Sequence, residues 1–155
     1  MAFSHLLTIA AIAANGIAAG IMLSTVIGIV PMMVALPYGR YVQTVQFLRP
    51  RFDPVMPITN GSALVLDVAL AAVSHGAASR GGFSLAAALL AAVMAVSIIK
   101  NVPINRFIMS LDSRRQPEDW AGRDPRARWR KWNLIRTGLA VAAFVTNIVA
   151  AVQLT

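Results

Sequence analysis

The sequence predicts an all-α protein, a four-helix transmembrane bundle with a short interfacial helix after the first span. Three observations support this fold. Of the 155 residues, 57% are hydrophobic and only 13% are charged, whereas about 25% of the residues in a water-soluble domain are charged. Four apolar stretches are close to or longer than the roughly 20 residues that cross a bilayer. Nearly all basic residues lie in two of the three connections between these stretches.

The apolar stretches predict one integral membrane domain of residues 1–155. The first stretch is too long for a straight crossing, so we expect it to be tilted or broken, with Pro31 and Pro37 at its exit. It lacks the basic start of a secretory signal peptide, which favours a retained span. The third helix is expected to continue to 110 and the fourth to start near 126. The predicted spans cover residues 6–36, 57–78, 83–99 and 134–154.

The connections determine the predicted orientation. The first mixes aromatic side chains with three arginines, a pattern typical of a short interfacial helix. The third carries ten of the fourteen Lys and Arg residues, whereas the second, a Gly-rich turn over residues 75–82, carries only Arg80. The positive-inside rule therefore places connections one and three in the cytoplasm and both termini outside. We expect a multi-pass protein of a bacterial cytoplasmic membrane.

Several functional classes are excluded or disfavoured by composition. The absence of cysteine excludes disulfides, thiolate nucleophiles and cysteine metal sites. His5 and His75 lack nearby carboxylates and would make a poor metal site, so no metal is predicted. The basic segment GRDPRARWRKWNLIR could contact nucleic acid. Its position directly before a span instead favours contact with the lipid bilayer, and no nucleic-acid partner is predicted.

Asp67 is the polar residue that most needs an explanation, because it lies near the middle of the second span. Asn60 and Ser74, seven residues away on either side, share its helical face, which should point into the bundle. Carboxylates within membranes mark functional sites by default. Asp67 could be an acid or base, a proton carrier or a cation ligand. Alternatively, it could simply pair with Arg136, Asn101 or a backbone donor.

The first span contains Asn15 followed by Gly16-x-x-x-Gly20, a spacing that lets another helix approach closely. We favour packing as the role of this motif, with Asn15 forming a hydrogen bond between helices. A contact with a ligand is the alternative interpretation.

The richest polar cluster is predicted at the cytoplasmic ends of the third and fourth helices. Asn101 and Asn105 lie one turn apart around Pro103, which should bend the helix. Amides beside an arginine guanidinium suit a carbonyl, phenolate, carboxylate or phosphate. The alternative is that the arginine anchors headgroups and the tryptophans form an aromatic belt. The fourth-helix residues follow i, i+3, i+4, i+7 spacing: Trp129, Trp132, Asn133 and Arg136.

These residues resemble the anthrone-oxygenase-like family of small four-helix membrane proteins. The resemblance rests on YVQTVQF after a long first span, then N-x-P-x-N, then W-x-x-W-N-x-x-R. It implies a compact four-helix bundle and, in some relatives, oxidation of anthrones to anthraquinones in polyketide pathways without an evident organic cofactor. The family pattern marks Asn101, Pro103, Asn105, Trp132, Asn133 and Arg136.

The expected function is therefore oxidation of a small lipophilic aromatic substrate, with molecular oxygen as co-substrate and no cofactor. Asp67, or less favourably His75, would take a proton. Two other classes stay open: a non-catalytic accessory or scaffold protein, and a proton-coupled exporter that uses Asp67 within a homo-oligomer. Whether Asp67 and Arg136 border one cavity discriminates between them. The oxyanion would be held by Arg136, Asn101, Asn105 and Asn133, and further substrate contacts would come from Trp129, Trp132, Asn15 and His75.

Overall fold

The computed structural model describes residues 2–153, in which every regular element is a helix. Four helical stretches are long and apolar enough to cross a membrane, which confirms the predicted fold class and indicates a multi-pass membrane protein. These stretches are Ser4–Ala35, Val55–Val73, Ala77–Met109 and Trp120–Val152.

The first and third stretches are each divided by a π-helical turn. The first consists of α1 (Ala2–Ser24), η1 (Thr25–Ile29) and α2 (Val30–Ala35). The third consists of α5 (Ala77–Val96), η2 (Ser97–Asn101) and α6 (Val102–Met109). The other helices are α3 (Tyr38–Phe52), α4 (Val55–Val73), α7 (Trp120–Arg123) and α8 (Arg126–Val152).

Each π-helical turn ends two residues before a proline. Pro31 and Pro103 have no N–H, so they cannot donate to the carbonyl four residues earlier. The preceding turn widens instead, and the N–H of Val30 and of Val102 bonds to the carbonyl five residues back. The break expected in the first span and the bend expected at Pro103 therefore take the form of wide turns.

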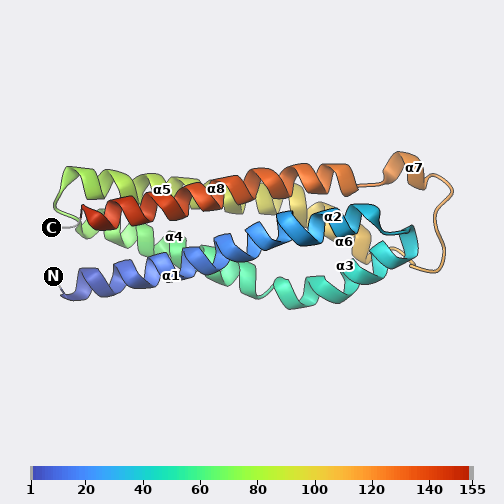
Figure 1. The fold of residues 1–155 in the computed structure, drawn as a ribbon, viewed down its shortest axis with the longest axis horizontal. Helices are drawn as coiled ribbons and strands as arrows, with labels where there is room; N and C mark the ends of the chain where they lie inside the picture. Colours follow the sequence, from blue (N-terminus) through green and yellow to red (C-terminus); the bar gives the residue numbers. More distant parts are fainter. Residues whose placement is uncertain (1, 154–155) are drawn as a thin grey trace.

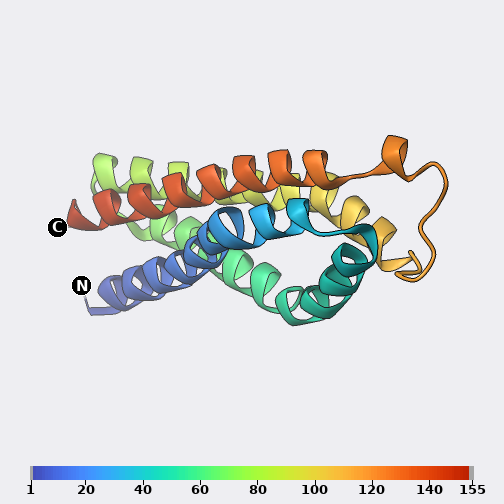
Figure 2. The same cartoon turned by 45° about the vertical axis from the view of Figure 1, so that its right-hand side comes forward.

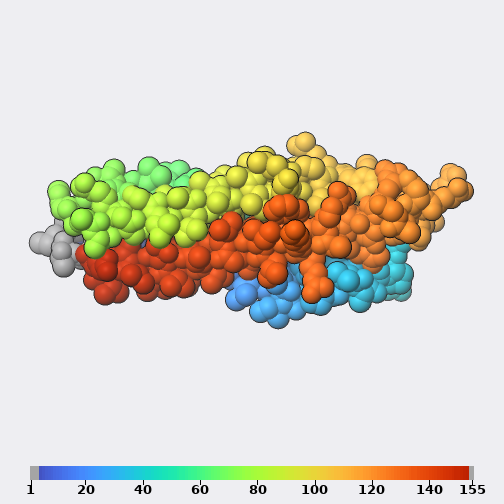
Figure 3. Space-filling model, turned by 90° about the horizontal axis from the view of Figure 1, so that it is seen from above, coloured from blue at the N-terminus to red at the C-terminus, as the bar shows by residue number. Residues whose placement is uncertain are grey.

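The four long helices lie side by side in an elongated bundle (Figure 1; Figure 2). We call the end that holds α3, α7 and the 110–119 loop the basic end. The chain termini and the α4–α5 turn lie at the other end, the terminal end (Figure 1). From above, α8 follows α5 along the bundle (Figure 3). Because α4 and α8 each pack against α1 and α5, they occupy diagonally opposite corners.

The α4–α5 turn is shorter than predicted. Only residues 74–76 are non-helical, and the rest of the predicted Gly-rich turn belongs to α5. Gly82 serves packing rather than turn formation, since a Cβ there would lie 2.6 Å from the Cβ of Ala150 on α8. Arg80 closes the turn by donating from Nη2 to the carbonyl of Ser74 at 2.9 Å.

Several polar side chains are buried among the apolar core of the bundle, whereas the outside of the bundle is largely apolar. Asn15, Asn60, Asp67 and Asn147 are buried, which confirms that the face of α4 carrying Asp67 points inward. Many large side chains on the outside are instead apolar and well exposed, as expected for a surface that faces lipid. Examples from the four spans are Leu6, Ile9, Ile27, Ile58, Val65, Leu85, Ile98 and Val149.

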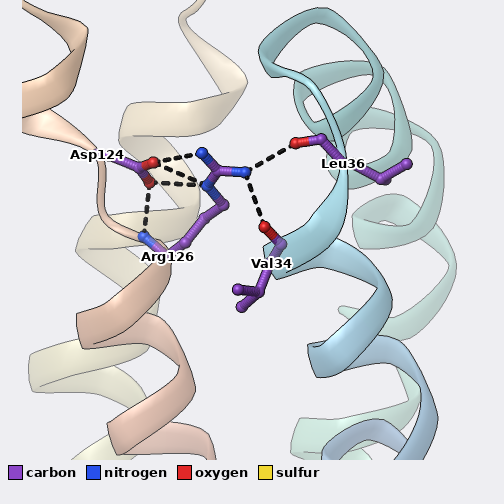
Figure 4. Close-up of polar contacts among 4 residues, drawn as sticks. All are labelled: Val34, Leu36, Asp124 and Arg126. Atoms are coloured by element: carbon purple, nitrogen blue, oxygen red, sulfur yellow. Dashed lines mark hydrogen bonds and ion pairs between the residues drawn. The ribbon is translucent and has the colours of Figure 1, made fainter.

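Hydrogen bonds from Arg126 join the start of α8 to the end of α2 (Figure 4). Nη1 of Arg126 donates to the carbonyls of Val34 at 3.1 Å and Leu36 at 2.8 Å, while its Nε donates to the Asp124 carboxylate. These are carbonyls at a helix C-terminus that lack partners within the helix. One arginine of the basic connection therefore has a structural role in joining the first and last spans.

Candidate functional site

Two adjacent cavities lie where the spans meet the basic end. The first has a volume of about 120 Å³ and the second about 160 Å³. The first is bordered mainly by apolar side chains of α1, η1 and α3, the second by α4, α5, η2 and α6. Because four residues border both cavities, a flat ligand that extended across them would pass these side chains: Asp53, Met56, Asn105 and Arg136.

Arg136 is fixed in place by two neighbours but has no carboxylate partner in the described part of the chain. Its Nε donates to Oδ1 of Asn133 at 3.1 Å, and its Nη1 donates to Oγ of Ser97 at 3.3 Å. Asn133 is itself held by a bond from Nδ2 to the Trp129 carbonyl. No ion pair to Arg136 occurs among residues 2–153. A half-buried guanidinium without a counter-charge favours an anionic or strongly polar ligand.

Two asparagines of the third span lie beside this guanidinium. Asn101 borders the second cavity and is buried, yet neither its Nδ2 nor its Oδ1 has a hydrogen-bond partner among residues 2–153. Asn105, one turn later, borders both cavities. Unsatisfied buried amides are rare in native proteins and often mark functional positions. The structure therefore brings together the predicted donors Arg136, Asn101, Asn105 and Asn133.

Both π-helical turns contribute to the site. Thr25 of η1 borders the first cavity, while Ser97 and Asn101 of η2 border the second. Ser97 and Asn101 are four residues apart, lie about one turn from each other and both face the cavity. Such π-helical turns occur frequently at functional sites.

Asp53 supplies a carboxylate at the edge of both cavities. It lies in the short connection between α3 and α4. Its Oδ2 accepts a hydrogen bond from Nε of Arg49 at 2.8 Å, and 53% of its side chain is exposed. The site thus combines a guanidinium, amides and a solvent-connected carboxylate with apolar walls.

A family model described as Anthrone oxygenase matches residues 52–146, more than half of the chain. The chain belongs to the anthrone oxygenase family. This finding confirms the resemblance predicted from the sequence. No curated protein and no solved structure matches the chain.

In this member of the anthrone oxygenase family, Asp67 lies apart from the cavities. It is fully buried, and its Oδ2 accepts a hydrogen bond from Nδ2 of Asn147 at 3.1 Å. It borders neither cavity. Its partner is therefore an asparagine of α8 rather than Arg136 or Asn101. The acid–base role predicted for it stays a prediction.

Asn15 and its neighbouring glycines also lie away from the cavities. Asn15 is fully buried, with no hydrogen bond from its amide to the described residues. Gly16 packs against the ring of Phe144, where an added Cβ would come within 3.0 Å, whereas Gly20 has open space. Only the first glycine of the motif therefore provides a close approach between helices.

The predicted aromatic and histidine contacts are divided between the two ends. Trp129 borders the first cavity. Trp132 lies outside both cavities, with Nζ of Lys100 5.1 Å from its ring centroid. His75 is exposed in the α4–α5 turn at the terminal end, and His5 is exposed on α1. Among the described residues, no group of three His, Asp or Glu side chains could hold a metal ion.

Three polar residues of this family member were not identified from its sequence: Thr25, Ser97 and Asp53. Thr25 and Ser97 each lie six residues before a proline, the spacing of the two π turns. Asp53 is the first acidic residue of the chain. Its isolation from other carboxylates could have identified it as a candidate site residue. Its place beside the cavities, however, depends on how α3 folds back toward the spans.

Proposed function

We propose that this protein is a membrane oxygenase that oxidises a flat phenolic aromatic polyketide, such as an anthrone, to a quinone. Family membership supports the oxygenase class. The observation that carries the proposal is the guanidinium of Arg136, which borders both cavities together with Asn105 and has no ion pair among residues 2–153. An oxyanion that develops on a lipophilic substrate would be stabilised by these donors.

The reaction needs no organic cofactor or resident metal. One molecule of oxygen oxidises the methylene carbon of the anthrone to a carbonyl and is reduced to one molecule of water. Loss of a methylene proton gives an aromatic phenolate-type anion that can pass an electron to oxygen directly. The protein then has to supply an apolar pocket, a proton acceptor and oxyanion stabilisation. Oxygen and anthrones both partition into lipid, where the cavities can receive them.

The cavities also bear on the alternative functions. The exporter considered from the sequence would couple protons through Asp67, and Asp67 borders neither cavity. A non-catalytic accessory protein would need no polar cavity, whereas two cavities meet at Arg136. These observations favour an enzyme over both alternatives.

The direct test is quinone formation by purified protein in detergent, compared with empty micelles because anthrones oxidise spontaneously. We expect a rate above this background that survives treatment with a chelator. Arg136→Lys keeps the charge but loses the planar fork, so the rate should fall by about 100-fold. The matched control is Arg130→Lys, an exposed arginine on the same helix, which should behave as wild type.

Three outcomes would contradict parts of this proposal. A wild-type rate for Arg136→Lys would indicate that this residue only anchors headgroups. Loss of activity after chelation would overturn the metal-free mechanism. No rate above empty micelles across a panel of anthrones and naphthols would reject the oxygenase function for those substrates and favour the accessory role.

A further inference from the structure

We propose that Asp53 is the general base of this oxidation, an inference that rests on the proposed function. A base must reach the substrate that Arg136 holds. Among residues 2–153, Asp53 is the acidic residue that borders both cavities, whereas Asp67 borders neither. A candidate base is selected first by its reach to the proton that it removes.

Asp53 and Arg136 border both cavities from different parts of the bundle. Asp53 lies two residues before α4, and Arg136 lies on α8, which occupies the diagonally opposite corner. In an anthrone, the methylene carbon and the carbonyl oxygen lie on opposite edges of the central ring. A flat substrate between the two corners can therefore direct its oxygen toward the guanidinium and its methylene group toward the carboxylate. Asn105, which borders both cavities, lies along the same path.

Asp53 also has a free oxygen and a route for protons. Arg49 occupies Oδ2, while no hydrogen bond to Oδ1 occurs in the described chain. Arg49 borders the first cavity and acts as a positioning residue that orients the carboxylate. Because about half of the Asp53 side chain is exposed, it can exchange protons with water. Asp67 is fully buried and has no such route.

The proposed steps conserve atoms and electrons. The methylene C–H bond breaks, its electron pair stays on the substrate as the phenolate-type anion, and the proton forms an O–H bond on Oδ1 of Asp53. The anion reduces oxygen and forms a C–O bond to it, giving a peroxide that takes the proton back from Asp53. Loss of the second methylene hydrogen, together with hydroxide from the O–O cleavage, releases water and leaves the carbonyl.

The experiment measures proton removal separately from oxidation. In anaerobic D₂O, wild-type protein in detergent should exchange the methylene protons of an anthrone faster than empty micelles do. Asp53→Asn should lower both this exchange and aerobic quinone formation by about 100-fold, the usual contribution of a general base. Asp53→Glu, which keeps a carboxylate, should recover part of both rates. Binding of the quinone product, followed by tryptophan fluorescence, should be retained in Asp53→Asn.

Two further variants make the test specific. The control is Asp119→Asn, which removes a comparable exposed ion pair, with Arg123 at 3.3 Å, at a residue that borders neither cavity. It should exchange and oxidise as wild type does. Asp67→Asn tests the other candidate base: loss of exchange in this variant alone would assign proton removal to Asp67.

The outcomes separate this inference from the proposed function. The role of Asp53 would be overturned if Asp53→Asn exchanged protons at the wild-type rate, or if only Asp67→Asn lost exchange. Either result would leave the proposed oxygenase function intact. If Asp53→Asn does not fold, Asp53→Glu keeps the test decisive. Wild-type stability with a lowered exchange rate that still exceeds empty micelles and an altered pH profile would support the base. An unchanged exchange rate and pH profile would overturn it. If wild-type protein neither exchanges nor oxidises the anthrone, both proposals fail.

Discussion

The terminal and basic halves of the bundle are packed with side chains of different size. The core of the terminal half is dominated by alanine, including Ala11, Ala63, Ala143 and Ala150. At the basic end, the largest buried cluster contains Tyr38, Tyr41, Ile108 and Trp120. Both cavities lie on the basic side, next to two π turns. Small side chains bring helices together and leave little space, whereas bulky side chains and interrupted helices create it.

The largest expected difference between the two ends is the side of the membrane on which each lies. Thirteen of the fourteen basic residues lie on α3, η2, α6, the 110–119 loop, α7 or the first half of α8, toward the basic end, and Arg80 alone lies at the start of α5 at the terminal end. We expect the basic end in the cytoplasm. In this cysteine-free chain, Ala78→Cys should react with an impermeant maleimide in intact cells, and Gln116→Cys only after permeabilisation; both parent residues are exposed. The opposite labelling pattern would reverse the orientation, and equal labelling would contradict four spans.

Adding side-chain volume to the terminal half should have the next largest effect, a loss of folding stability. A Cβ at Gly82 would meet Ala150 at 2.6 Å, so Gly82→Ala should destabilise the bundle by about 1–3 kcal/mol. The matched control is Gly81→Ala, where no atom lies within 4 Å. Thermal unfolding in detergent measures both. A Tm for Gly82→Ala equal to that of the control would show that the terminal half is not tightly packed.

The buried polar pair of the terminal half should have a smaller, coupled effect. Asn147→Leu leaves the Asp67 carboxyl without its hydrogen-bond donor and should cost about 1–3 kcal/mol. Replacing both residues with leucine should restore most of that stability, because two apolar side chains leave no unsatisfied group. A double-mutant cycle of unfolding free energies checks this. Additive effects would mean that the two side chains do not interact.

The smallest effect is expected at Tyr41 in the basic end. Its hydroxyl is buried without a hydrogen-bond partner in the described chain, so Tyr41→Phe should change stability at neutral pH by less than about 1 kcal/mol. Burial, with a smaller contribution from the Asp124 carboxylate, raises the pKa of Tyr41. The stability from a neutral buried tyrosine is present below the unfolded-state pKa of about 10 and is lost as the pH rises above it.

Unfolding of the two proteins across alkaline pH tests this dependence. Wild type should lose stability more steeply above about pH 10 than Tyr41→Phe does. Parallel curves for the two proteins would show that Tyr41 ionises as readily in the folded protein as in the unfolded chain.

Much of the fold, but only part of the site, followed from the sequence. The spans were evident because the length of an apolar stretch reports directly on crossing a bilayer. The spacing of Asn133 and Arg136 correctly predicted that they share a face, since three residues make nearly one helical turn. In contrast, the periodicity of one helix carries no information about its axial position relative to another helix.

Asp67 illustrates this limit. Arg136 was one of the partners considered for it, but its partner Asn147 lies eleven residues farther along α8, which is about 16 Å of helix. The position of Asp53 at the cavities could not be predicted from the sequence either, because it depends on how α3 packs against α6 and α4. Both cases concern contacts between segments that are distant in the sequence.

The π turns have a further consequence for rotational register. Three positions of the third span that border the second cavity, Val93, Ser97 and Asn101, are spaced four residues apart across η2. An α-helix turns by about 100° per residue and a π turn by less, so η2 accommodates about one additional residue without rotating the helix that follows. One residue deleted from the third span while the π geometry is kept would rotate the following segment by about 100°. Asn105 would then leave the cavities and the apolar stripe of α6 would turn away from α3. The wide geometry of η2, as much as the identity of its side chains, therefore keeps the donors facing the site.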